Sequence, residues 1–538
     1  MDPENLRSDS RRDFFRRAGV GVTGAALGAV CAAAPASAQT SSGHFPAFSV
    51  MEYGAKGDGT TIDTPAINKA IEAAAAAGGG SVLFPAGTYA CFSIRLKSKV
   101  ELHLERGATI LAAEGAQYDA AEPNTPWNAY QDYGHNHWHN SLIWGEGLQD
   151  VSITGPGLIY GKGLSKGYGP GPKTEDPGVG NKSISLKNCH NVILRDFSIL
   201  QGGWFGILAT GVDNFTIDNL IIDTNRDGMD IDCCRNVRVS NCTVNSPWDD
   251  GICLKSSYGL GYARATENVT ITNCYVSGYW RLGSVIDGTW KKYTPEEHIP
   301  HTGRIKFGTE SNGGFINITI SNCVFEGCQG FALESEDGAL LEDVAINNIT
   351  MRNISSAPLF LRLGSRLRGP KETTKVGTLR RIDIGNIVCW NTASTISSIL
   401  SGIPGYQIED VSIHDLLIVA QGGGTAEQAA IHPPEYEDKY PEPRMFGPMP
   451  AFGFYVRHMK GLSMSNVRLQ TEAADARPAI YLEDVDGAEF FRIRTQNAGN
   501  TPAFSLHQVK NFAVRYSEPV ADTHLPQADN VTLPKANS

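Results

Sequence analysis

Short segments in which apolar and polar residues alternate recur along most of the chain. Nine of them are copies of one pattern, beginning at residues 191, 214, 236, 268, 317, 343, 381, 410 and 461, as in NVILRDFSI, NFTIDNLII and NVRVSNCTV. A period of two is typical of β-strands, and a repeat of this length is typical of a solenoid in which each copy forms one coil. The pattern therefore predicts an all-β fold, a parallel β-helix.

An Asn stands at the sixth position of most copies: Asn219, Asn241, Asn273, Asn322, Asn348, Asn386 and Asn466. A single buried Asn leaves polar groups unsatisfied, whereas stacked Asn residues can bond side chain to backbone along the axis at a turn between sheets. We interpret this column as structural, and the fold prediction rests on it.

The start of the predicted domain differs from the repeats. Thr64-Pro65 followed by AINKAIEAAAAA has the spacing of a helix that stops at Gly78-Gly79-Gly80. We expect residues 39–98 to form an N-terminal cap with this helix and the first coils, and residues 99–538 to form the β-helix. Uneven spacing between copies predicts inserted loops at about residues 118–140, 277–303 and 420–458.

The first 38 residues have the features of an export signal. Arg11-Arg12 precedes an apolar run that ends near Ala34, and Ala36-Ser37-Ala38 is a typical cleavage site. The run is too short and too rich in Ala and Gly for a stable membrane span. We therefore predict twin-arginine-type export to the periplasm or the outside, cleavage after Ala38, and no membrane attachment afterwards.

Charge and cysteines exclude several function classes. Residues 39–538 carry 41 basic and 53 acidic residues, which argues against nucleic-acid binding because a basic footprint is missing. No C-x-x-C pair is present, so a zinc site built on cysteines is not expected. Cys242, Cys274 and Cys323 follow Asn in three copies and predict a stacked apolar column. The alternating histidines of residues 118–140 lack a carboxylate motif, so we expect no metal and a loop that faces substrate.

Three carboxylates share one predicted surface. Asp227 and Asp249 each lie 13 residues after the start of a copy, and Asp250 follows directly. The spacing places Asp227 and Asp249 at one position of successive coils, ~4.8 Å apart. Crowded carboxylates raise one another's pKa, so that one holds a proton while another is ionised. Glycosidic hydrolysis needs this combination; a solvated acidic turn or a calcium site is the alternative.

The stretch from Asn225 to Ser256 resembles glycoside hydrolase family 28, the polygalacturonase family. That family has an N-T-D segment, a D-D segment one coil later, then G-H-G and R-I-K, and this chain reads Asn225-Arg226-Asp227 and then Asp249-Asp250. The resemblance implies a single right-handed, pectin lyase-like β-helix. It also implies that Asp249 is the general acid, and that Asp227 and Asp250 position and deprotonate water.

The third and fourth family motifs are altered. His301 is the nearest histidine to the G-H-G position. Arg304-Ile305-Lys306 spells the fourth motif one coil early, and Ala332 and Glu334 stand where the family has Arg and Lys. Either Arg304 with Lys306, or Arg362 with Arg366, supplies the missing charge from a neighbouring coil, or the sugar at that subsite is neutral.

Other residues near the aspartates are candidates for substrate binding. Trp204 and Arg281 are expected to flank the carboxylates in the column, and Lys255 follows the Asp249-Asp250 pair. With His301, Arg304 and Lys306 they complete the predicted set. The aromatic residues of 277–303 either stack on sugar or pack among themselves, and residues 435–458 form either a rim loop or a clamp across coils.

These observations predict an exported, monomeric, inverting hydrolase of a pectin-type polysaccharide or oligosaccharide, exo-acting and without cofactor. Inversion implies acid and base carboxyls ~6.5–9.5 Å apart. A β-helix polysaccharide lyase or epimerase is the alternative within enzymes. A non-catalytic carbohydrate-binding solenoid is the alternative of another class. The exact sugar, the linkage and any disulfide pairing do not follow from the sequence.

Overall fold

The computed structural model describes residues 47–132, 134–166, 176–393, 395–496 and 501–534. The predicted export signal at residues 1–38 lies outside these ranges. None of the helices in this part of the chain is long and apolar enough to cross a bilayer.

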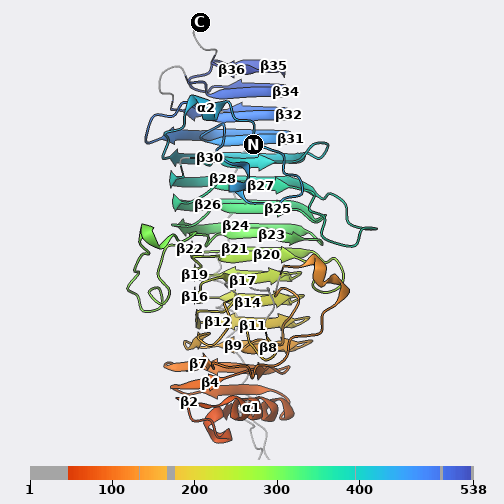
Figure 1. Ribbon diagram of the computed structural model, residues 1–538, viewed down its shortest axis with the longest axis vertical. Helices are drawn as coiled ribbons and strands as arrows, with labels where there is room; N and C mark the ends of the chain where they lie inside the picture. Colours follow the sequence, from red (N-terminus) through yellow and green to blue (C-terminus); the bar gives the residue numbers. More distant parts are fainter. Residues whose placement is uncertain (1–46, 133, 167–175, 394, 497–500, 535–538) are drawn as a thin grey trace, which may run out of the picture. The chain divides into compact units, whose positions relative to one another are not determined.

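The described residues form a right-handed parallel β-helix, as the sequence predicts (Figure 1). Strands of successive coils pair in parallel and make three faces, named A, B and C in chain order within a coil. Face A contains β1 (Ala47–Ser49), β3 (Gly80–Phe84), β6 (Val100–Leu104), β9 (Gln149–Thr154), β12 (His190–Arg195), β15 (Asp213–Asp218), β18 (Arg235–Ser240) and β21 (Thr266–Thr272). Face B contains β2 (Asp58–Ile62), β4 (Gly87–Cys91), β7 (Ala108–Ala112), β10 (Leu158–Tyr160), β13 (Ser198–Leu200), β16 (Ile221–Asp223), β19 (Thr243–Asn245) and β22 (Tyr275–Ser277).

Face C carries the residues of interest. It contains β5 (Ile94–Arg95), β8 (Ile143–Glu146), β11 (Lys182–Lys187), β14 (Phe205–Thr210), β17 (Asp227–Asp232), β20 (Ile252–Ser256), β23 (Ile305–Ser311), β25 (Phe331–Ser335), β27 (Leu359–Leu363) and β29 (Ser398–Ser401). In later coils faces A and B merge into long strands: β24 (Phe315–Glu326), β26 (Leu340–Ile354), β28 (Thr378–Thr392) and β30 (Ile408–Ala420). The last coils are β31 (Phe454–Thr471), β32 (Ile480–Phe491), β33 (Arg494–Thr495) and β34 (Phe504–Arg515), with antiparallel β35 (Thr523–Ala528) and β36 (Val531–Leu533).

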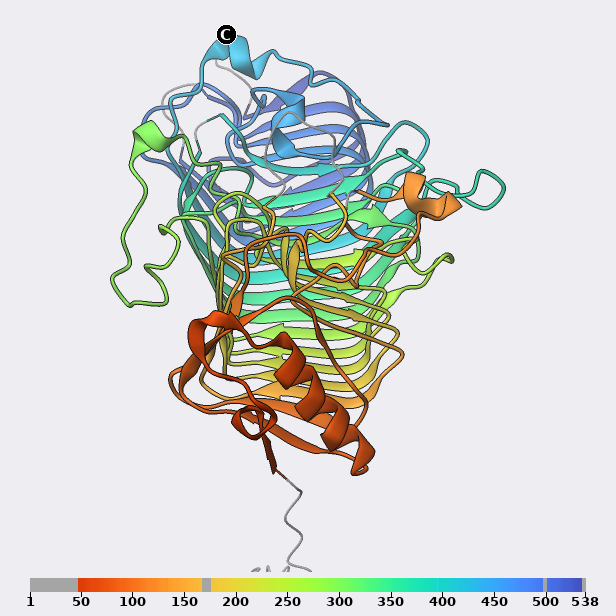
Figure 2. The same ribbon diagram turned by 60° about the horizontal axis from the view of Figure 1, so that its bottom comes forward.

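Helices are few and lie outside the coils. The helix α1 (Thr64–Ala76) begins at the predicted Thr64-Pro65 and buries Ile67 and Ile71 against the first strands. It covers the coil end at the bottom of the stack (Figure 2). The others are short: η1 (Val50–Tyr53), η2 (Pro126–Tyr130), η3 (Pro295–Glu297), α2 (Ala426–Ala429) and η4 (Pro443–Phe446).

The Asn column stacks as predicted, but its exposed members bond to side chains of the neighbouring coil, so the expected bonds to the backbone are wrong. Each lies at the corner between faces A and B with a left-handed φ near 55°. Asn tolerates this conformation better than most residues because its short side chain bonds locally. The Asn348 amide donates to Asn322 Oδ1 at 3.1 Å and accepts from Asn386. A second ladder runs through Asn191, Asn214, Asn236, Asn268 and Asn317.

The cysteine column is confirmed. Cys242, Cys274 and Cys323 are buried in the apolar core, directly before residues that pair in register. All ten cysteines among the described residues are buried and free.

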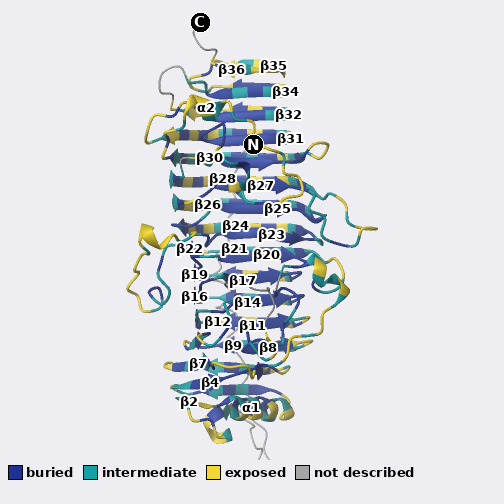
Figure 3. Ribbon diagram, in the orientation of Figure 1, coloured by how far each residue is buried: buried dark blue, intermediate teal, exposed yellow. Residues whose placement is uncertain are grey.

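Face C differs from face A in what covers it. Face A strands such as β15 alternate between buried and exposed residues, whereas β17, β20 and β23 are buried along their whole length. Figure 3 shows these strands in dark blue, and side chains of residues 118–140 and 432–451 contact their outer side. Polar residues on the outside of these strands are therefore enclosed, and the candidate site lies among them.

Candidate active site

The three aspartates meet at the start of two neighbouring face C strands. Asp227 begins β17, and Asp249-Asp250 precede β20. One carboxylate oxygen from each lies within 4.8 Å of the other two. Met229 pairs with Ile252, so Asp250, and not Asp249, holds the position equivalent to Asp227. The predicted equivalence of Asp227 and Asp249 is thus wrong by one residue.

The aspartates differ in exposure. The Asp249 side chain is 27% exposed and accepts a hydrogen bond from Arg226 Nη2 at 2.6 Å. The side chains of Asp227 and Asp250 are buried. The Asp250 backbone N–H points at the other two, 3.2 Å from Asp227 Oδ1 and 3.1 Å from Asp249 Oδ1. Asp249 is therefore the member of the group that a large ligand can reach.

Two buried cations hold Asp250. Arg304 Nε donates to Asp250 Oδ1 at 2.7 Å, and Lys306 Nζ lies 3.4 Å from Oδ2. Burial alone would raise the pKa of Asp250, but Lys306 and Arg304 lower it to about 2. Asp250 is therefore an anion throughout the physiological pH range.

Asp227 has the opposite tendency. Burial and the nearby Asp249 charge raise its pKa well above its ordinary value. A carboxyl whose pKa is raised and one whose pKa is lowered thus lie side by side, the kind of pairing that acid/base hydrolysis uses.

Arg304 and Lys306 both form ion pairs with acidic side chains of the protein. Arg304 also donates to Gln329 and to Glu442 Oε1 at 2.8 Å, and Lys306 lies 3.6 Å from Glu334. Lys306 pairs in register with Ala332 of β25, so Arg304-Ile305-Lys306 lies in the coil directly before Ala332 and Glu334. Burial raises the pKa of Glu334 to about 7, against the attraction of Lys306 and Arg304.

The second pair of candidate cations is also enclosed. Arg362 is buried and donates to the carbonyl oxygens of Glu435 and Tyr436 at 3.0 Å, and Arg366 pairs with Asp337. Face C beyond the aspartates therefore offers buried, paired cations.

Residues 432–451, here called the strap, cross several coils of face C. The carbonyl oxygens of Pro433 and Pro434 accept from Arg457 of β31, while Glu442 reaches Arg304 beside β23. Phe446 of η4 packs against Phe360 of β27. Of the two interpretations of this segment, a clamp across coils is confirmed.

A second ionic network lies beneath the aspartates. Lys255 Nζ is 3.2 Å from Glu310 and 3.8 Å from Asp230, and all three are buried. His135 Nε2 lies 3.0 Å from Asp230 Oδ2. Glu310 and Asp230 outweigh the effect of burial and raise the pKa of His135. Lys255 thus pairs with protein carboxylates, where we predicted substrate binding.

Two loops meet over this network. The Asp132 backbone N–H donates to Glu310 at 3.0 Å, and Arg368 Nη1 donates to Asp132 at 2.6 Å. The loop at residues 118–140 is thereby joined to residues 364–377 beside the aspartates.

Three further predicted residues lie elsewhere or in other roles. Trp204 packs with Trp138 and Phe205, and the Arg226 guanidinium lies 4.1 Å from its ring centre. Arg281 belongs to the 277–303 loop and pairs with Glu297 at 2.6 Å. The coil after Asp249 continues at β23 because Ile252 pairs with Ile305, so the predicted place of Arg281 in the column is wrong.

His301 lies in a separate surface pocket of about 190 Å³ with Tyr279, Asn353 and Gln421. Its Nδ1 lies 2.8 Å from the Gly278 carbonyl oxygen. The aromatic residues of 277–303 contact one another, as in the Trp280–Trp290 and Tyr279–Trp280 pairs. They form a self-packed cluster, one of the two predicted alternatives.

Several site residues escaped the sequence analysis. Arg226, His135, Asp230, Glu310 and Glu442 contact the aspartates or their partners. The strand sequences held a partial signal, because DGMDID and IKFGTES place polar residues where one-sided burial would leave them exposed. A cation between the aspartates is disfavoured since Arg226, Arg304 and Lys306 already contact two of the three.

Two family models match the chain: "Rhamnogalacturonase A/epimerase, pectate lyase-like" over residues 47–122 and "Right handed beta helix region" over residues 182–367. A probable polygalacturonase of Vitis vinifera is 25% identical over 68% of this chain and 74% of its own length. An exo-poly-alpha-D-galacturonosidase of Dickeya chrysanthemi is 28% identical over 58% of this chain and 56% of its own length. The family 28 exopolygalacturonase of Yersinia enterocolitica shares the fold, with a TM-score of 0.61 at 17% identity over 82% of this chain and 78% of that one. The chain is therefore a divergent sequence relative of proteins named polygalacturonase, and it shares the right-handed β-helix fold of the Yersinia enzyme.

Proposed function

We propose that this protein is a glycoside hydrolase that cleaves a pectin-type polysaccharide or oligosaccharide. One observation carries the proposal: three clustered aspartates in which the pKa of Asp227 is raised and that of Asp250 is lowered to about 2. The relatives named polygalacturonase support the substrate class.

Exposure assigns the roles. Asp249 is the exposed carboxyl, the one that a glycosidic oxygen can reach, and acts as the acid that protonates the leaving oxygen. Asp250, held ionised by Arg304 and Lys306, acts with Asp227 to bind and deprotonate water.

Water is the nucleophile in this proposal. Asp227 and Asp250 are buried, so neither can attack a sugar carbon directly, whereas a water molecule can reach them. The nearest carboxylate oxygens lie within 4.8 Å, closer than the ~6.5–9.5 Å we expected for inverting enzymes. Inversion is therefore proposed from burial and not from separation, and proton NMR of the first product anomer tests it.

The charge of the substrate is met by Arg226. Arg304 and Lys306 are buried and paired, while Arg226, which pairs with Asp249, keeps 22% of its side chain exposed. We propose that a uronate next to the cleaved bond binds at Arg226. Ala332 and Glu334 are fully buried, so no sugar subsite is placed there. The match to the model named for rhamnogalacturonase A over residues 47–122 adds rhamnogalacturonan to the candidate substrates.

The loops support action at a chain end. Residues 118–140 and 364–377 join through Asp132 and Arg368, and the strap covers the following coils. A polymer passing along face C would have to cross these loops, so we propose exo cleavage.

Mass analysis of products from polygalacturonate and rhamnogalacturonan oligosaccharides tests the proposal. We expect saturated products from the wild type and a 10²–10⁴-fold loss of rate in Asp249→Asn. Asp150→Asn, at an exposed corner where Asn191 donates to the carboxylate, is the matched control and should keep full activity. Unsaturated products would replace hydrolysis by a lyase reaction, and equal rates in wild type and Asp249→Asn would remove the catalytic role.

A further inference from the structure

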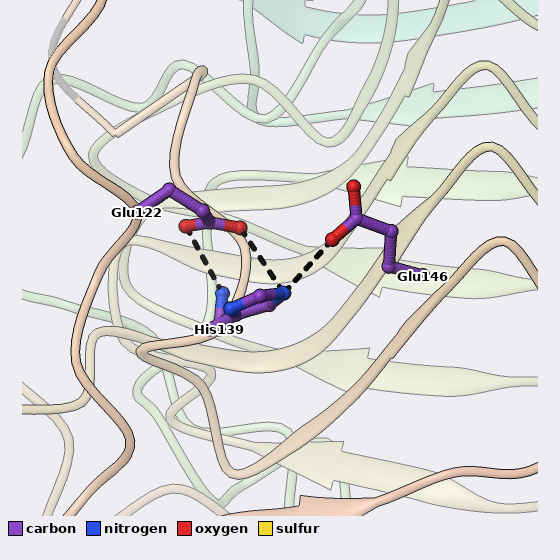
Figure 4. A group of neighbouring side chains, drawn as sticks. All are labelled: Glu122, His139 and Glu146. Atoms are coloured by element: carbon purple, nitrogen blue, oxygen red, sulfur yellow. Dashed lines mark hydrogen bonds and ion pairs between the residues drawn. The ribbon is translucent and has the colours of Figure 1, made fainter.

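A histidine and two glutamates converge outside the aspartate site. Glu122 and His139 come from the loop at residues 118–140, and Glu146 ends β8. Figure 4 shows the two carboxylates approaching the His139 ring from different sides. Glu122 and Glu146 follow no metal-binding spacing in the sequence, and the fold brings both to His139.

The distances between the facing atoms suit a small metal ion. His139 Nε2 lies 3.0 Å from Glu146 Oε2 and 3.5 Å from Glu122 Oε1. Ligands bound tetrahedrally to zinc at about 2.0–2.1 Å are separated from one another by about 3.3–3.4 Å. The three donor atoms all lie within 4.8 Å of one another, so small movements bring them to the spacing of a zinc ligand set.

The remaining atoms of these side chains are fixed by protein contacts. Glu122 Oε2 accepts the backbone N–H of Trp138 at 2.8 Å, and Glu146 Oε1 pairs with Lys187 at 3.0 Å. The His139 ring packs on Trp144 with centroids 3.9 Å apart. Each residue therefore holds one donor atom toward the common centre, and such outer contacts typically orient metal ligands.

A second observation points to a ligand. Glu122 Oε1 is fully buried and accepts no hydrogen bond from the described residues, and the same holds for His137 Nδ1. His137 Nδ1 lies 4.0 Å from Glu122 Oε2. Buried oxygen and nitrogen acceptors without donors are costly unless something binds them.

We propose that Glu122, His139 and Glu146 bind a zinc ion, with His137 or water as the fourth ligand. An imidazole nitrogen among the ligands favours zinc over calcium or magnesium, which prefer oxygen alone. The bound ion ties the 118–140 loop to β8. Because the same loop carries His135 and Asp132, which contact Asp230 and Glu310, the ion steadies one wall of the aspartate site.

Isothermal titration of the metal-free full chain with zinc chloride tests the proposal. We expect one ion per chain, at least 100-fold weaker binding in His139→Gln and Glu146→Gln, and a zinc-dependent rise of the melting temperature in the wild type only. His190→Gln, an exposed histidine that contacts Gln149, should bind as the wild type does. Circular dichroism checks that each variant is folded.

No stoichiometric zinc binding by the wild type would overturn the proposal, and so would unchanged binding by both ligand variants. These readouts do not involve activity, so they stand apart from the proposed hydrolysis. The effect on catalysis does rest on that function: zinc removal should raise KM more than it lowers kcat.

Discussion

In two regions of the β-helix, side chains of one type stack on neighbouring strands, with opposite results. At the corner between faces A and B, Asn348 donates to Asn322 and accepts from Asn386, so each amide satisfies the next. At the start of face C, Asp227 and Asp250 stack in register with Asp249 beside them. A carboxylate has no proton to donate to its neighbour, so this stack is strained unless cations or a shared proton relieve it. The aspartate stack, which costs free energy, lies at the candidate site. The asparagine stack, whose hydrogen bonds are satisfied, stabilises the fold.

The largest expected effect comes from removing the anion between two buried cations. Asp250→Asn leaves Arg304 and Lys306 without a full counter-charge, and breaking a buried pair costs about 3–5 kcal/mol. We expect a loss of unfolding free energy of this size, measured by chemical denaturation, and loss of hydrolysis. Asp150→Asn is the control. A change below about 1 kcal/mol would mean that solvent already screens this pair.

The contribution of Glu334 to the free energy of unfolding should depend on pH. Its pKa is raised from 4.5 to about 7 by burial, which outweighs Lys306 and Arg304. A raised pKa means that the neutral acid stabilises the fold, so this contribution is complete below about pH 4.5 and is lost as pH rises through about 7. At about 1.4 kcal/mol per pKa unit the loss is about 3 kcal/mol.

Glu334→Gln should remove this pH dependence, because glutamine resembles the neutral acid at every pH. Denaturation curves at pH 4.5, 6 and 7.5 compare the two proteins. Glu483→Gln, on β32 far along the chain, serves as the control. Parallel stability profiles for wild type and Glu334→Gln would show that Glu334 is ionised in the fold, contrary to our expectation.

The next largest change in unfolding free energy is expected from the Asn ladder. Asn348 has φ 57° and is exposed. Asn348→Ala should lose about 1–2 kcal/mol of unfolding free energy, because alanine resists the left-handed conformation and breaks two ladder bonds. Asn348→Gly relieves the backbone strain and should recover part of this loss. Equal values for the two variants would assign the whole effect to the side-chain bonds.

The smallest expected effect comes from replacing one of the stacked aspartates by asparagine. Because burial and Asp249 raise the pKa of Asp227, its charge destabilises the fold as pH rises above 3.8. Asp227→Asn should therefore gain stability at neutral pH, within the about 0.5–2 kcal/mol typical of stabilising substitutions, while hydrolysis falls. A variant that loses both stability and activity would show that the Asp227 charge supports the fold.

The repeated strands and the stacked columns could be predicted from the sequence, whereas the contacts buried beneath the loops could not. Strand alternation gave the β-helix, Thr64-Pro65 gave the helix start, and the Asn and Cys columns were found by position. The clustering of Asp227, Asp249 and Asp250 followed from repeat spacing. The register error of one residue arose because the turn before β20 holds one residue more than the repeat implies.

Contacts between loops that are far apart in the sequence do not follow the repeat. Glu442 lies 138 residues from Arg304, and Asp132 lies 178 residues from Glu310. No repeat relates such pairs, so their meeting depends on loop conformations that alternation does not encode. Burial of Lys255 and Lys306 followed from those loops as well, and for that reason two predicted substrate contacts turned out to pair with protein carboxylates.

The strap also has a consequence for the order of assembly during synthesis. A solenoid can add coils one after another as the chain emerges, since each coil needs only its neighbour. Arg304 departs from that rule, because its partner Glu442 is translated 138 residues later. The strands that carry the aspartates can therefore form early, while the clamp on Asp250 is completed only when the strap arrives. The candidate active site is therefore completed only after the strap has been synthesised, although the strap contains none of its aspartates.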